Sequence, residues 1–231
     1  MSKNILLLHG AIGAAIQFDK LKKLLSQNFS VFTIDFEGHG LNSNSHRAFS
    51  IEHFTENLKA FLNQHQDKQF LIFGYSMGGF VALYQSAIDD SQISGIVTLG
   101  TKFHWDAETS AREVKMLNPE KIKEKIPAFA SLLKQRHTDS FENVLMKTAD
   151  MMIELGKKNP LTSPLLSQIK IPIKLMVGEN DTMVTIDETQ LTFHSIPNAQ
   201  FQLLTDTVHP IEKVNMDLLC FILSEFIDQI I

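Results

Sequence analysis

The sequence predicts an α/β protein built on a mostly parallel, doubly wound sheet of six strands. Short apolar runs alternate along the 231 residues with amphipathic segments, which is the pattern of successive β-α-β units. The runs are mainly apolar rather than alternating, as expected of parallel strands that are buried on both faces. The six predicted strands are residues 4–8, 29–35, 69–74, 93–99, 171–177 and 200–204.

Helices are predicted between these strands and at the C-terminal end of the chain. Apolar residues recur there at intervals of three and four, so that one face of each segment is apolar. Right-handed crossovers would then place the helices on the two faces of the sheet. The predicted helices cover residues 18–25, 54–62, 76–87 and 212–230.

The alternation stops after the fourth strand, and about 65 residues pass before the fifth strand begins. We therefore expect residues 1–100 and 166–231 to form an α/β core and residues 101–165 to form an inserted helical lid. Asn118-Pro119 predicts the start of one lid helix. Its apolar stripe would continue through Ile122, Ile126, Phe129, Leu132 and Leu133. A second stripe runs through Val144, Leu145, Met151, Met152 and Leu155, and Gly156 followed by Asn159-Pro160 is expected to end that helix.

Aromatic and methionine side chains of the lid suggest a pocket for an acyl group, with Trp105, Phe129 and Met146 as the candidate lining residues. The alternative interpretation is that most of these side chains only pack the lid helices together. Because ligands of open α/β sheets bind at the C-terminal edge of the strands, the lid is expected to lie over that edge.

Composition excludes several classes of protein. The chain has 21 basic and 26 acidic residues, a net charge of −5, which disfavours a nucleic-acid partner. Its one cysteine, Cys220, permits no intramolecular disulfide. We find no apolar window long enough to span a bilayer and expect a cytoplasmic protein. The alternation of His104, Asp106 and Glu108 could suggest a metal site, but no second cluster completes it, so no metal is expected.

The segment Gly74-Tyr75-Ser76-Met77-Gly78 carries the strongest functional signal in the sequence. It follows a predicted strand and precedes a predicted helix, which is the context that a G-x-S-x-G nucleophile elbow requires. A serine on such a turn exposes its hydroxyl, and the flanking glycines leave room for the neighbouring strand and helix. Ser76 is therefore the candidate nucleophile.

A serine hydroxyl becomes reactive only when a base takes its proton, and His209 is the best-placed base among nine histidines. It follows the last predicted strand after a short polar loop, at the same edge of the sheet as the elbow. His9 and His39 also lie at strand ends but belong to other loops. The remaining histidines, among them His137, fall on predicted helical or surface segments and are expected to be solvated.

The base needs a carboxylate that orients it, and Asp181 follows the fifth predicted strand. Glu179 and Asp206 are alternatives. The order Ser76, Asp181, His209 is the order found in α/β-hydrolases and differs from those of chymotrypsin and subtilisin.

Five motifs in this order make the chain resemble the α/β-hydrolase fold superfamily over nearly its whole length. They are Leu8-His9-Gly10-Ala11, the loop from Asp35 to Gly40, the elbow, Gly178-Glu179-Asn180-Asp181 and Val208-His209-Pro210. The first two strands of the full family sheet are missing from the pattern, which favours a compact six-stranded version. The elbow also resembles that of a menaquinone-pathway synthase, although Phe80 stands where an arginine is expected.

The resemblance implies a serine hydrolase that cleaves a small or medium carboxylic ester, or a related acyl compound, through an acyl-enzyme. It also implies that the N–H groups of Ala11 and Met77 form the oxyanion hole and that no cofactor is required. The expected partner is a small-molecule acyl substrate. Two alternatives stay open: a C–C bond hydrolase or lyase on the same fold, and a ligand sensor that retains the triad.

Overall fold

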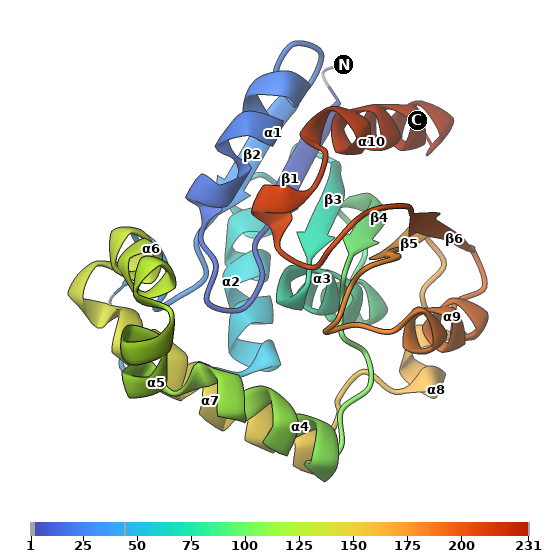
Figure 1. Cartoon of the computed structure of the whole chain (residues 1–231). Helices are drawn as coiled ribbons and strands as arrows, with labels where there is room; N and C mark the ends of the chain where they lie inside the picture. Colours follow the sequence, from blue (N-terminus) through green and yellow to red (C-terminus); the bar gives the residue numbers. More distant parts are fainter. Residues whose placement is uncertain (1–2, 44, 231) are drawn as a thin grey trace.

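A six-stranded, fully parallel sheet forms the centre of the computed structural model, which describes residues 3–43 and 45–230, apart from the side chain of Asp139 (Figure 1). The strand order is β2-β1-β3-β4-β5-β6. The strands are β1 (Asn4–Leu8), β2 (Ser30–Ile34), β3 (Phe70–Tyr75), β4 (Ile93–Leu99), β5 (Ile173–Gly178) and β6 (Ala199–Leu204). The predicted fold class is confirmed, and the strand ends differ from the predicted ones by at most two residues.

Helices cover both faces of this sheet, because successive residues of a strand point to opposite faces and both faces are apolar. In β1, Ile5 and Leu7 pack against one helical layer, whereas Leu6 and Leu8 pack against the other. The first layer holds α1 (Asp19–Leu25) and α10 (Met216–Ile230). The second layer holds α2 (Ile51–Asn63), α3 (Met77–Ile88), α8 (Ser163–Leu166) and α9 (Ile186–Ser195). Short 3-10 turns occupy Ala15–Phe18, Lys115–Leu117, Thr138–Ser140 and Ile211–Lys213.

Between β4 and β5, ahead of α8, the chain forms four helices that Figure 1 shows in green and yellow below the sheet. They are α4 (Ala107–Val114), α5 (Pro119–Lys125), α6 (Pro127–His137) and α7 (Phe141–Lys157). Together we call them the inserted helices. The side chain of Asn118 caps α5, as its Oδ1 accepts a hydrogen bond of 2.9 Å from the N–H of Lys121.

The single apolar stripe predicted after Asn118 is wrong, because the helix breaks at Ile126. Pro127 has no N–H and disfavours the helical conformation of the residue before it, so Ile126 adopts φ −137° and ψ 60° and a new helix begins. The break turns Ile126 and Leu132 toward solvent.

The inner face of α7 is buried as its spacing predicts, and the helix ends at Lys157, within the predicted stop from Gly156 to Pro160. Gly156 also allows α4 to approach, since a Cβ at this position would lie 2.2 Å from Ser110 Oγ. Val144, Met151 and Leu155 of α7 belong to the same apolar cluster as the strand residues Leu6, Leu8 and Ile72. The insertion therefore packs directly on the core of the sheet.

None of the helices in the described part of the chain combines the length and apolar character needed to cross a lipid bilayer.

Candidate active site

Ser76 lies on a sharp turn between β3 and α3, at the C-terminal edge of the sheet. Its backbone has φ 51° and ψ −119°, a conformation that is rare for a residue with a side chain and costs on the order of 1–3 kcal/mol. The turn is held by a 2.9 Å hydrogen bond from the Ser76 N–H to the carbonyl of Leu99. The hydroxyl of Thr101 donates a second bond of 2.9 Å to the Ser76 carbonyl. This is the geometry expected of a nucleophile elbow.

Glycine at position 78 is required by the close packing of this turn. A Cβ at Gly78 would lie 2.3 Å from the carbonyl oxygen of Leu8, at the end of β1. The glycines of the motif therefore let the elbow sit tightly between its neighbours, as the sequence spacing predicts.

Asp181 and His209 form a buried hydrogen-bonded pair at the same edge of the sheet. His209 Nδ1 lies 2.7 Å from Asp181 Oδ2, and the two side chains are 10% and 2% exposed. The other carboxylate oxygen, Oδ1, accepts bonds of 2.8 and 2.9 Å from the N–H groups of Met183 and Val184. These bonds fix the carboxylate, which in turn holds the imidazole with Nδ1 as the donor.

The two alternative carboxylates lie elsewhere. Glu179 and Asp206 are both exposed, and the Glu179 carboxylate accepts a 3.2 Å bond from the N–H of Asp206. Asp181 is thus the carboxylate that the structure pairs with His209.

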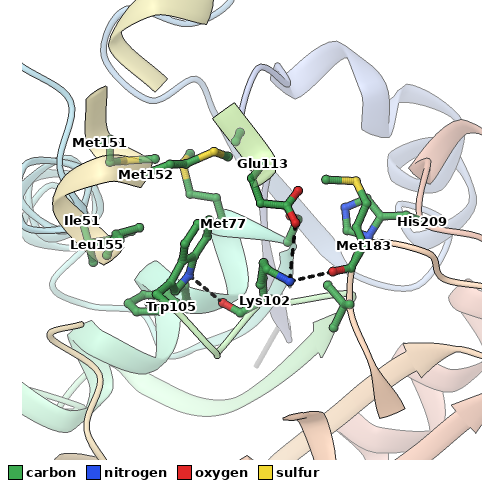
Figure 2. A pocket seen from close by; sticks show the side chains of 14 residues that line it. Ile51, Met77, Lys102, Trp105, Glu113, Met151, Met152, Leu155, Met183 and His209 are labelled. Atoms are coloured by element: carbon green, nitrogen blue, oxygen red, sulfur yellow. Dashed lines mark hydrogen bonds and ion pairs between the residues drawn. The ribbon is translucent and has the colours of Figure 1, made fainter. Parts of the chain in front are cut away.

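Ser76 and His209 border one cavity that lies between the sheet edge and the inserted helices (Figure 2). Its volume is about 480 Å³, including the open space at its mouth. No hydrogen bond joins Ser76 to His209 among the described residues, and such bonds are commonly long in unliganded enzymes. Lys102 and Glu113 also border the cavity, and the rest of its wall is apolar and comes from Ile51, Phe80, Trp105, Met151, Met152, Leu155, Met183 and Val184.

Ala11 and Met77 border the same cavity. Met77 is the first residue of α3, so its N–H has no acceptor within the helix. The loop that carries Ala11 passes close to the elbow, since a Cβ at Gly10 would lie 3.0 Å from Ser76 Cβ. Both predicted oxyanion residues are therefore beside the candidate nucleophile.

Of the three predicted pocket residues, only Trp105 borders the cavity. Phe129 packs in a separate cluster with Leu117 and Ile122, and Met146 is 52% exposed. The expectation for these two residues is corrected. Met146 lies on α7 but not on its buried face, so its chemical character alone did not indicate its position.

Three buried histidines lie beneath the loop of Ala11, and one of them overturns an expectation. His137 was expected to be solvated but is fully buried. Its Nδ1 accepts a 3.0 Å bond from the N–H of Gly40, and its Nε2 donates a 2.9 Å bond to the carbonyl of Ile12. His137 thus ties α6 to the loop that contains Ala11. The ring of His39 lies between His137 and His9, with ring centroids 5.6 and 5.1 Å away.

Burial lowers the pKa of all three histidines. For His9, desolvation outweighs the hydrogen bond to the Gly10 carbonyl and the charge of Asp35, and the pKa falls to about 4. His9 is neutral at pH 7 for this reason, with Nδ1 as donor to Gly10 and Nε2 as acceptor from the N–H of Phe36. It is a structural group and not a second general base.

Tyr75 is a residue of the site that the sequence analysis did not single out. Its hydroxyl donates a 2.9 Å bond to the carbonyl of His209, and its ring centroid lies 5.4 Å from the imidazole. Burial, followed by the charges of Glu212 and Asp181, raises the pKa of this phenol. Tyr75 therefore stays protonated and supports the backbone of the candidate base. Its position inside the elbow motif was the one available signal.

The acidic and histidine residues at the start of the insertion form a surface pair. His104 Nε2 lies 3.1 Å from Asp106 Oδ2, and both side chains are largely exposed. In the described ranges, no group of three or more His, Cys, Asp or Glu side chains is placed to hold a metal ion.

The parallel sheet, the elbow and the aspartate-histidine pair define the class of this protein. Residues 3–118 match the alpha/beta hydrolase fold family, and the chain belongs to that family. The predicted family and the prediction of an α/β-hydrolase are confirmed.

Among its relatives are a serine hydrolase-like protein of Danio rerio and a pimeloyl-[acyl-carrier protein] methyl ester esterase of Aliivibrio fischeri. The first is 25% identical in an alignment 220 positions long that covers 78% of this chain and 66% of the relative. The chain thus spans slightly less than two thirds of that protein. The second is 24% identical in an alignment 217 positions long that covers 85% of this chain and 82% of the relative. The solved structure of MenH from S. aureus has the same fold, with a TM-score of 0.78, 23% identity and coverage of 98% and 94% of the two chains.

Proposed function

We propose that this protein is a serine hydrolase that cleaves a small or medium carboxylic ester, or a related acyl compound, through an acyl-enzyme. The observation that carries the proposal is the buried Asp181–His209 pair, 2.7 Å apart, whose histidine borders the cavity that the strained Ser76 also borders. A serine, a histidine and a carboxylate on one cavity have the arrangement required for acyl transfer.

In this proposal Ser76 Oγ attacks the carbonyl carbon of the substrate while His209 Nε2 takes its proton. Asp181 holds the imidazole in the tautomer with Nδ1 protonated and stabilises the imidazolium that forms. The protonated histidine then gives the proton to the leaving oxygen, and the acyl group remains on Ser76. Water, deprotonated by the same histidine, hydrolyses that ester and restores the serine.

Ala11 and Met77 are proposed to supply the oxyanion hole. The N–H of Met77 points from the start of α3, whose dipole also favours negative charge at that position. Two donors of this kind stabilise the developing oxyanion by several kcal/mol, since the loss of one typically costs roughly 2.7–4 kcal/mol.

The inserted helices are proposed to act as a lid, with residues 101–165 as the lid and residues 1–100 and 166–231 as the core. Trp105, Met151 and Met152 close the cavity over Ser76 with aromatic and thioether surface. The mostly apolar wall of the cavity suits a short or medium acyl chain. Two relatives of the chain are named as an esterase/lipase and as a methyl ester esterase, which supports an ester as the substrate.

The test is hydrolysis of p-nitrophenyl esters from acetate to long-chain acyl groups by the wild-type protein and by Ser76→Ala. Turnover that depends on Ser76, with a preference for short or medium chains, would support the proposal. Ser91→Ala is the matched control, because Ser91 is exposed at the opposite edge of the sheet, before β4. Ester hydrolysis by Ser76→Ala at the wild-type rate would refute the proposal. A folded protein that only binds esters would favour a sensor, and cleavage of diketones alone would favour a C–C hydrolase.

A further inference from the structure

The apolar cavity contains one group of charged side chains. Lys102 and Glu113 both border the cavity and are 10% and 4% exposed (Figure 2). Lys102 Nζ lies 3.8 Å from Glu113 Oε1 and 3.7 Å from Glu188 Oε2, and it donates a 2.7 Å bond to the carbonyl of Met183. Charges so deep in an apolar wall are costly unless every polar atom has a partner.

Glu188 has such partners for both of its oxygens. Oε1 accepts bonds from the N–H groups of Phe103 and His104, and Oε2 accepts bonds from the N–H and hydroxyl of Thr185. Its role is structural: it caps α9 and anchors the start of the insertion.

Glu113 differs because one of its oxygens has no partner. Oε1 accepts bonds of 3.3 Å from Arg112, whereas Oε2 is buried and makes no hydrogen bond with any described residue. A buried carboxylate oxygen without a donor costs free energy that the folded protein recovers when a ligand supplies the donor. The cavity wall is where a substrate would lie.

We propose that Glu113 Oε2 accepts a hydrogen bond from a hydroxyl or amide N–H on the acyl group of the substrate. This proposal rests on the proposed function, because it assigns the substrate class of the same cavity. Glu113 is thus a specificity-determining residue, and the preferred esters carry an uncharged hydrogen-bond donor in an otherwise apolar acyl chain.

The charges of the group favour an uncharged donor over an ammonium group. Lys102 and Arg112 balance Glu113 and Glu188, so the group is neutral as a whole. Lys102 also lies beyond hydrogen-bonding distance of both carboxylates. A hydroxyl or an amide contains a hydrogen-bond donor and an acceptor oxygen close together. The N–H groups of Lys102 that do not bind Met183 can donate to that oxygen while the substrate donates to Glu113.

The test measures binding in the Ser76→Ala background, so that it does not depend on turnover. Trp105, the one tryptophan of the chain, borders the cavity and reports binding by its fluorescence. The probes are the methyl esters of N-acetyl-β-alanine and of δ-oxohexanoic acid, which have the same chain length and carbonyl but differ in the N–H group. We expect the amide to bind about ten-fold or more tightly than the ketone, as for a hydrogen bond to a charged group.

Adding Glu113→Leu should bring the ratio of the ketone and amide dissociation constants to about one. Adding Glu113→Gln, which keeps the side-chain shape, should lower this ratio below that of the parent. Glu108→Gln is the matched control because Glu108 is an exposed glutamate of the same helix. Equal binding of the two probes to the parent, or a ratio that Glu113→Gln and Glu113→Leu leave unchanged, would overturn the proposal. Ser76-dependent ester turnover with equal probe binding would reject this inference and keep the proposed function. Tighter binding of the amide probe by a protein that does not turn over esters would support this inference and reject the proposed function.

Discussion

Acid should destabilise this protein well above the pH at which carboxylates are protonated, because His9, His39 and His137 are buried as neutral groups. Protonation would remove the acceptor that His9 Nε2 offers to the N–H of Phe36, and likewise the acceptor that His137 Nδ1 offers to Gly40. It would also place positive charge in a site that is shielded from solvent.

The size of the effect follows from His9, whose pKa falls from 6.5 to about 4 on folding. Between these two pH values the unfolded chain binds the proton and the native protein does not, so stability falls as the pH falls. The contribution is fully present above pH 6.5. By linkage, about 2 kcal/mol of it is lost by pH 5 and about 3 kcal/mol by pH 4. The lowered pKa values of His39 and His137 act in the same direction.

The assay is urea unfolding at about pH 7.5, 6 and 5. The free energy of unfolding should fall by at least about 2 kcal/mol over this range. His137→Gln should flatten the decline, because glutamine can accept from Gly40 and donate to Ile12 but does not titrate. His194→Gln, at an exposed position of α9, should leave the decline unchanged. Parallel declines in the wild-type protein and in His137→Gln would refute this account of the cluster.

Three further predictions concern the site and its support. Asp181→Asn should lower kcat for ester hydrolysis by on the order of 10⁴ while the protein stays folded, because the imidazole of His209 loses its tautomer; a near-normal kcat would contradict the assigned role. Tyr75→Phe removes the bond to the His209 carbonyl and should lower thermal stability by about 1 kcal/mol, measured by calorimetry; an unchanged melting temperature would argue against it. Gly156→Ala should destabilise by about 1–3 kcal/mol in urea unfolding despite alanine's higher helix propensity, because of the contact with Ser110, and Ser110→Ala should recover part of the loss.

The sheet and its edge could be predicted because their signals are local. Each strand is an apolar run, and parallel strands bring their C-terminal ends to one edge, so the sequence pattern alone makes neighbours of Ser76, Asp181 and His209. The nucleophile elbow could be predicted for the same reason, because its strand, turn and helix are contiguous in the chain.

The lining of the cavity was not predictable, because it depends on how helices are rotated against distant segments. Met146 and Met151 have the same chemistry and lie on the same helix, yet one is exposed and the other buried. His137 follows the polar pair Gln135-Arg136, which favours exposure, but its partners, Gly40 and Ile12, are distant in sequence. The absence of a described hydrogen-bond partner for Glu113 Oε2 also depends on how distant segments pack, so the sequence did not indicate it.

The apolar contacts of α7 limit which of the inserted helices, the proposed lid, can move when a substrate enters or a product leaves. Swinging α7 away would break the cluster it shares with β1 and β3 and expose the centre of the protein to water. By contrast, α5 and α6 pack against α7 in a smaller cluster outside the core of the sheet, and α6 is tied to the core by the hydrogen bonds of His137 and the Arg136–Glu212 ion pair. If the inserted helices act as the proposed lid, we expect α5 and α6 to move first, and the two hydrogen bonds of His137 must break for α6 to leave the core. The rates of substrate access and product release should then depend on these bonds rather than on the catalytic groups.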